Sequence, residues 1–279
     1  MTDIATRMER ALMERFGASL PVSADTPGAE ALARMLEHRS QRRYTPQAVS
    51  AELLQLLYAC ALSAPSKSDL QQADIVRVGD SAVRTAIADL IPDNPWVLNA
   101  PVFLVFCGNN RRIRQVAKLR GKEFANDHLD AFMNAAVDAG IVMATFIHAA
   151  EAVGLGCCPI SSVRNHAQTV SNLLELPDWV FPVAGLCVGY PSEPGQITSR
   201  LPLEVTVHTD RFDEAGIAAK IDAYDQRRNA RQQYKKQRGV ARFGTAPFYG
   251  WSEDKARQYA KPERADFGAF IRRKKFDLT

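Results

Sequence analysis

Hydrophobic residues in the first part of the chain are spaced as they are on one face of a helix. The stretches 1–16, 29–39 and 50–64 carry this spacing, and Ser50 supplies an N-cap for the third. The connector 21–28 is rich in proline, glycine and small polar residues, which favour a loop. The pattern therefore predicts three helices before the first strand.

Continuous apolar runs and one alternating segment predict the strands. The run 100–109 is continuously apolar between Pro101 and Gly108, which is typical of a buried strand, and 73–78 and 181–191 are predicted as two further strands. The segment 203–210 alternates with period two, as a half-exposed edge strand does. Because helices and strands are interleaved, with long helices around a modest sheet, the fold class is α+β or mixed α/β.

One helix should occupy the centre of the molecule. The segment 127–153 has an apolar stripe that widens after Ala139 until almost every face is apolar. Such a helix is buried on all sides, in part against a second subunit. Gly154 and Gly156 are expected to cap its C-terminal end.

Composition and charge exclude several classes of protein. The chain has 279 residues, of which 46% are hydrophobic and 24% charged, and a formal net charge of only +4, so no global field favours nucleic acid. The five cysteines form no CxxC pair, which indicates reduced, buried thiols. The amphipathic N-terminus contains acidic residues and is no signal peptide, and no apolar run is expected to be long enough to span a bilayer, so a cytoplasmic protein is expected.

Familiar catalytic motifs are missing, but five polar segments interrupt the apolar elements. There is no GxGxxG after a strand, no P-loop, no HExxH and no histidine pair at metal-ligand spacing. Taken singly, the basic cluster HRSQRR suits a solvated helix end, a nucleic-acid contact or an anion site. Taken together, the segments supply guanidinium groups for a phosphate, hydroxyls for a polyol and donors for a heteroaromatic edge, which suits flavin mononucleotide (FMN). The segments are 38–43, 64–71, 159–162, 198–202 and the basic tail.

The order HRSxRxY, SAPSxSxLQ, AAExxGLG, GLCxGYP and RLP resembles the flavin-dependent nitroreductase superfamily. The chain is most similar to its oxygen-insensitive NADPH nitroreductases and NADPH–flavin oxidoreductases. The resemblance implies a nitroreductase-like α+β fold with a mixed, mostly antiparallel sheet flanked by helices. It also implies an intertwined homodimer with a long central dimer-core helix. The expected parts are an N-terminal helix and connector (1–28), an FMN-binding core (29–214) and a helical extension with a basic loop (215–279).

The resemblance assigns cofactor-binding residues motif by motif. His38, Arg39 and Ser40 would line the FMN phosphate and ribityl side, and Arg200 would close on the phosphate. Arg42 would lie at the N1–C2 edge, where a cation favours the reduced flavin. No side chain need be catalytic, because the flavin N5 carries the chemistry. The residues that would contact the ring are Pro65, Ser66 and Ser68 in a loop under it, Gln71 at its pyrimidine edge, and Pro159, Ile160, Ser161 and Ser162 on the dimethylbenzene and N5 side.

The basic tail completes the functional interpretation. Arg238 and Arg242 match a loop that receives the 2′-phosphate of NADPH, so NADPH is favoured over NADH as cosubstrate. We therefore expect ping-pong hydride transfer from NADPH through FMN to a nitroaromatic, quinone or flavin acceptor. Alternatives are a narrow-specificity reductase on the same fold, such as a reductive dehalogenase or a biosynthetic oxidoreductase, or a nucleic-acid-binding protein using the tail. In the last case aromatic residues of the tail, Tyr234, Phe243 and Tyr249, would stack on bases.

Overall fold

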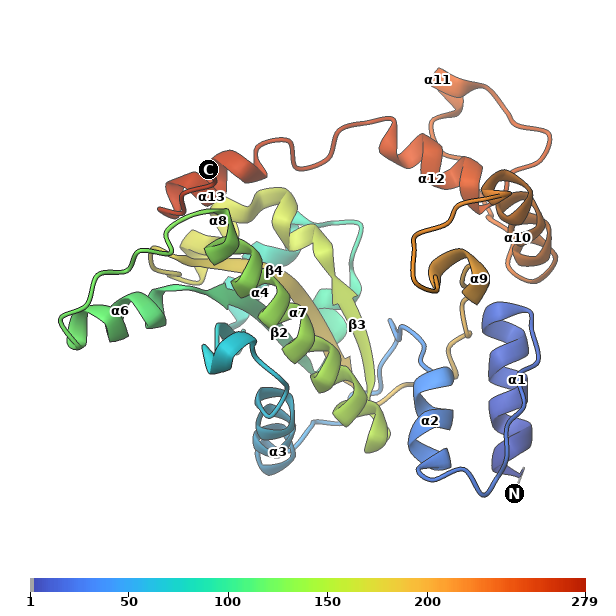
Figure 1. Cartoon of the computed structure of the whole chain (residues 1–279), viewed down its shortest axis with the longest axis horizontal. Helices are drawn as coiled ribbons and strands as arrows, with labels where there is room; N and C mark the ends of the chain where they lie inside the picture. The colour runs from blue at the N-terminus through green and yellow to red at the C-terminus, as the bar shows by residue number, and fades with distance from the viewer. Residues whose placement is uncertain (1–2) are drawn as a thin grey trace. The chain divides into compact units, whose positions relative to one another are not determined.

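The computed structural model describes residues 3–279, which form two compact units (Figure 1). The chain up to Arg39 and Gln196–Glu263 form the first unit. Ser40–Gly195 and Arg264–Thr279 form the second unit.

The second unit is built on a four-stranded sheet in the order β1-β2-β4-β3. All three pairings are antiparallel, so β1 and β3 are the edge strands. The only parallel pairing in the described part of the chain is an isolated bridge from Ser40 to Cys157. The strands are β1 (Ala73–Arg77), β2 (Val102–Asn109), β3 (Gly156–Ile160) and β4 (Val180–Gly189), which confirms the strands predicted over 73–78, 100–109 and 181–191. Only the first of these, β1, is largely half-buried.

Helices cover both faces of this sheet, and this explains why β2 is apolar at successive positions. Leu104 and Phe106 face the cluster formed with α7 and α3, whereas Phe103 and Val105 belong to the cluster on the opposite face. Phe106 meets Phe146 of α7 edge to face, with ring centroids 5.9 Å apart. The helical segments of this unit are α3 (Ala51–Leu62), η1 (Lys67–Asp69), α4 (Ser81–Leu90), α5 (Trp96–Asn99), α6 (Arg111–Leu119), α7 (Leu129–Ala152), η2 (Ser161–His166), α8 (Ala167–Leu173) and α13 (Phe267–Arg273).

The central helix α7 runs across the sheet, as Figure 1 shows. With 24 residues and a mean hydropathy of 1.4 in its most apolar window, it is long and apolar enough to cross a membrane, so the expectation that no such run exists is wrong. One side of the helix packs on the sheet, whereas Leu129, Met133 and Val137 on another side are exposed, so within one chain the helix is not buried on all sides as predicted. Gly154 follows the helix end in a left-handed conformation (φ +81°), as predicted, but Gly156 is the first residue of β3 and caps nothing.

The first unit is helical. Its helices are α1 (Ile4–Phe16), α2 (Ala29–Leu36), α9 (Leu203–Thr206), α10 (Ile217–Arg231), α11 (Val240–Phe243) and α12 (Trp251–Tyr259). The strand predicted over 203–210 is wrong, because Leu203–Thr206 forms a short helix after Pro202 and the remainder pairs with no strand. Alternation stabilises a strand only when a neighbouring strand receives its hydrogen bonds and side chains.

Candidate functional site

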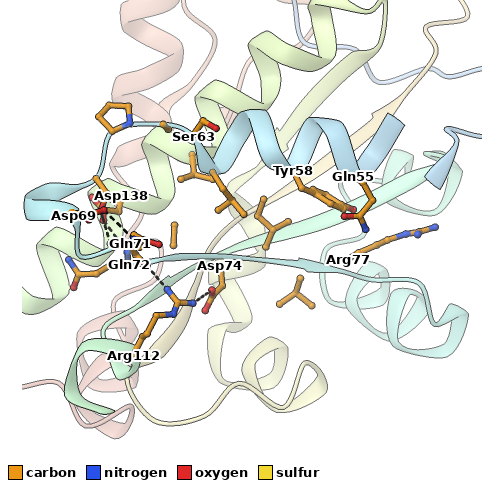
Figure 2. Close-up of a pocket in the computed structure, with 18 residues that line it drawn as sticks. Gln55, Tyr58, Ser63, Asp69, Gln71, Gln72, Asp74, Arg77, Arg112 and Asp138 are labelled. Atoms are coloured by element: carbon orange, nitrogen blue, oxygen red, sulfur yellow. Dashed lines mark hydrogen bonds and ion pairs between the residues drawn. The ribbon is translucent and has the colours of Figure 1, made fainter. Parts of the chain in front are cut away.

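A polar loop at the end of α3 borders a cavity of about 1220 Å³ (Figure 2). The cavity follows α3 and the edge strand β1, and Pro65, Ser66 and Gln71 of the predicted flavin loop line it. Ser68 lies in the same loop, within η1, but outside the cavity lining. The structure therefore brings these four predicted residues together.

This loop is held in an unfavourable backbone conformation. Ser68, Asp69 and Gln71 have φ angles of 49°, 57° and 51°. A left-handed conformation costs an L-residue about 1–2 kcal/mol, so three such residues within four positions need external support. Such strain persists only where the surrounding structure imposes it.

The support comes from Asp138, a buried residue of α7 that the sequence analysis missed. Its carboxylate, in a residue only 2% exposed, accepts hydrogen bonds from Ser66 Oγ (2.7 Å), Lys67 N (3.2 Å) and Gln72 N (3.1 Å). Figure 2 shows Asp138 beside the loop at one end of the cavity. A signal was present in the sequence, because Asp138 is the only charged residue in the apolar stretch 131–147, and a buried charge requires partners.

Ser66 connects the Asp138 carboxylate to the backbone of Gln71. Its hydroxyl donates to Asp138 and accepts from the Gln71 backbone N–H at 2.7 Å. Arg112 also donates to the Gln71 carbonyl and pairs with Asp74 of β1. The Ser66 hydroxyl is therefore engaged within the protein. The Gln71 side chain donates to Asp69 Oδ1 at 3.1 Å, and Gln71 and Asp69 both line the cavity.

A second group of predicted residues gathers at the β3 edge. Ser40 bridges Cys157, and the next residue, Gln41, donates its backbone N–H to the Cys157 carbonyl at 2.8 Å. Arg42 lies over the Trp96 ring, 5.2 Å from its centroid. The remaining members follow directly along the chain, Pro159 and Ile160 in β3 and Ser161 and Ser162 in η2.

The two serines of this group are held by side chains that the sequence analysis did not single out. Asn94 Nδ2 donates to Ser162 Oγ at 2.9 Å, and Arg264 Nη2 to Ser161 Oγ at 3.4 Å. Burial raises the pKa of the neighbouring Cys158 thiol, so it is no candidate nucleophile. All five cysteines are free, as predicted, and only Cys60 is exposed.

The two groups lie at opposite edges of one sheet. The loop of Gln71 adjoins β1, whereas Arg42 and Pro159 adjoin β3, with β2 and β4 in between. Neighbouring strands are about 4.8 Å apart, so the two edges are separated by about 14 Å. Within one chain the structure does not bring the two groups together.

In the first unit, the segments that carry His38 and Arg200 are joined by Arg15 of α1. This arginine is 6% exposed and donates to the carbonyls of Leu36 (Nε, 3.1 Å), His38 and Thr198 (3.3 Å). Arg39 follows His38 and donates to the Glu37 carbonyl at 2.9 Å.

Arg200 lines a second cavity, of about 640 Å³. Its Nη1 donates to Thr198 Oγ1 at 2.8 Å, and Arg228 and Lys255 add two further cations to the lining. No acidic side chain lines this cavity in the described residues. The cavity is therefore suited to an anion.

Arg238 and Arg242, the predicted NADPH residues, lie in the same unit and are held by bonds within it. Arg238 Nε pairs with Asp254 Oδ1 at 3.1 Å, and Arg242 Nη1 donates to the Ala260 carbonyl at 2.9 Å. Burial alone would raise the pKa of Asp254, but hydrogen bonds from Lys255 and Tyr249 lower it below its usual value. Tyr249 is only 9% exposed, so it cannot stack on nucleic-acid bases.

Comparison with known proteins shows which family this chain resembles. Residues 35–190 match the model of the Nitroreductase family, and residues 199–279 match that of the Nitroreductase family, C-terminal domain. The chain belongs to the nitroreductase family. The match confirms the resemblance on which the predicted site residues depend, while α1 lies outside both matched ranges.

Individual nitroreductase relatives are similar over most of their length. The chain is 36% identical to a Bacillus subtilis (strain 168) protein named FMN reductase (NAD(P)H), over 71% of this chain and 80% of that protein. It is 34% identical to NADPH-flavin oxidoreductase of Vibrio harveyi, over 69% and 78%. Among solved structures, B. megaterium NfrA2 superposes with a TM-score of 0.81 at 31% identity, covering 90% of this chain and 99% of that one. These likenesses confirm the nitroreductase fold.

Proposed function

We propose that this nitroreductase is an FMN-dependent NAD(P)H oxidoreductase that passes hydride from NADPH to nitroaromatic, quinone or flavin acceptors in a ping-pong cycle. The observation that carries the proposal is the family match over nearly the whole chain, with relatives named FMN reductase and NADPH-flavin oxidoreductase. The loop held by Asp138 supports it, because a strained and well-braced backbone is characteristic of ligand sites.

The residues present fit FMN. Arg42 lies over the Trp96 ring and beside the Cys158 thiol, and it can serve the edge of the ring that gains negative charge on reduction. In the first unit, His38, Arg39 and Arg200 are basic groups for the phosphate, and serine hydroxyls and the Gln71 amide suit the polar edges of the flavin. Bound FMN would accept and donate hydride at its N5.

In this scheme the residues of the chain bind the flavin and orient it for hydride transfer. Arg42 would stabilise the developing charge, and the loop of Gln71 would set the position of the ring. We propose no general acid, because no carboxylate is presented by the predicted ring-contacting residues. The open, roomy cavity at β1 suits two substrates that use one site in turn.

We further propose a homodimer in which each FMN takes the Arg42 group from one copy and the Gln71 loop from the other. The two groups lie at opposite edges of one sheet, so a second copy is needed to complete a single site. The outer side of α7 supports this, because Leu129, Met133 and Val137 are 50%, 55% and 44% exposed. Contiguous exposed apolar side chains of this kind mark an interface. A cytoplasmic location is consistent with five free cysteines.

An absorbance spectrum followed by anaerobic addition of NADPH, and separately NADH, tests the function. We expect a flavin spectrum that NADPH bleaches faster than NADH does. A protein that stays colourless after incubation with FMN would overturn the proposal. A panel of nitro, quinone and halogenated acceptors then separates a broad reductase from a narrow one, since a dedicated enzyme prefers one acceptor by orders of magnitude.

A further inference from the structure

The helix α1 precedes the residues that match the nitroreductase models, yet its C-terminal end is bonded to both segments that carry the predicted phosphate ligands. Arg15, in the last turn of α1, donates to the carbonyls of Leu36 and His38 on one segment and of Thr198 on the other. His38 immediately precedes Arg39, Leu36 lies three residues before it, and Thr198 lies two residues before Arg200. An element outside the family match thus reaches the phosphate side.

The bonding is reciprocal. The last carbonyls of a helix lack partners within it, and here the Arg15 carbonyl accepts from the Arg200 backbone N–H at 2.7 Å. Ser199 Oγ donates to the Glu14 carbonyl at 3.4 Å, and Arg231 of α10 pairs with the Glu14 side chain at 3.1 Å. Both the side chain and the main chain of Arg15 therefore fix the segment of Arg200.

A lysine could not replace this arginine. Burying a cation is costly unless its donors are satisfied, and Arg15 is only 6% exposed. Its planar guanidinium presents five donors in a fixed fork, which allows one side chain to reach three carbonyls from two segments distant in sequence. A lysine ammonium carries the same charge on one atom and cannot span that arrangement.

We propose that Arg15 is a positioning residue for the FMN phosphate. By holding the segments of His38 and Arg200 at a fixed separation, α1 preorganises the cations that meet the phosphate. This inference rests on the proposed function, because it assumes that FMN is the ligand. It adds that a helix outside the family match sets the affinity for the phosphate end of the cofactor.

Flavins with and without the phosphate provide the test. The full-length protein is stripped of flavin, and FMN and riboflavin are titrated against wild type, Arg15→Lys, Arg15→Met and the control Arg10→Met. Arg10 lies on the same helix but is exposed, with its nearest carboxylate, Glu37, 3.9 Å away. Thermal unfolding of each variant is recorded, and Arg15→Lys alone decides the matter if Arg15→Met does not fold.

We expect Arg15→Lys to weaken FMN binding about tenfold, as the loss of one charge-assisted hydrogen bond implies, and to change riboflavin binding less than twofold. Equal weakening of both flavins would show a general structural role and overturn the inference. Full FMN affinity in Arg15→Lys, with a loss only in Arg15→Met, would show that charge alone matters and would also overturn it. If wild type binds neither flavin, the proposed function itself fails, which is a distinguishable result.

Discussion

Replacing Asp138 by asparagine tests whether the flavin loop depends on a buried carboxylate. Asparagine keeps the volume, and its carbonyl oxygen can still accept from Ser66 Oγ and Gln72 N, which share one carboxylate oxygen. Its amide group then faces the Lys67 N–H, which loses its acceptor. One lost hydrogen bond to a charged group costs about 1.5–3 kcal/mol, and the two remaining bonds weaken because the acceptor is neutral.

Asp138→Asn therefore removes about 3 kcal/mol of hydrogen-bond stabilisation from the loop. This is similar to the strain energy of its three left-handed residues, at about 1 kcal/mol or more each. The loop should therefore leave its present conformation for a large share of the time. A free-energy change of this size corresponds to roughly a hundredfold shift in population. We expect FMN affinity to fall by a comparable factor while the rest of the fold persists.

Hydrogen exchange measures this effect directly. The backbone amides of Lys67, Gln71 and Gln72 should exchange much faster in Asp138→Asn, whereas amides of β2 should be unchanged. Asp130→Asn is the matched control, since Asp130 lies on the same helix in an exposed position. Unchanged exchange at the three loop amides, together with wild-type FMN affinity, would refute the reasoning.

Three further predictions concern other parts of the molecule. Arg42→Gln should make the flavin potential about 30 mV more negative if the cation favours the reduced form tenfold, and spectroelectrochemistry would show no shift if Arg42 lies elsewhere. Met133→Asp, which places a charge on the exposed apolar side of α7, should convert a dimer to monomers and abolish FMN binding; light scattering that still finds dimers would contradict the proposed interface. Because the folded-state pKa of Asp254 is lowered, its stabilisation is present above its unfolded pKa of about 4 and is lost as pH falls through the folded value. Asp254→Asn should therefore lower the melting temperature at pH 7 but hardly at pH 2, and an equal loss at both values would show that charge is not involved.

Local signals in the sequence determined much of the fold. The Ser50 side chain accepts from the Leu53 N–H and begins α3 as predicted. The apolar run of β2 is buried at every position, and the long apolar segment forms α7. These elements could be predicted because capping and burial depend on residues close together in the chain. The order of the short motifs was enough to identify the nitroreductase family and FMN as cofactor.

The tertiary structure decided how the candidate site is assembled. The segment 203–210 has the alternation of a strand, but no strand within residues 3–279 pairs with it. The support of the flavin loop by Asp138 joins residues 66 to 72 positions apart, and that of Arg15 to Thr198 joins residues 183 apart. The placement of Arg42 and Gln71 at opposite edges follows from the strand order, which no local pattern encodes. Periodicity reports which side of an element is buried, whereas the identity of the partner depends on how the whole chain packs.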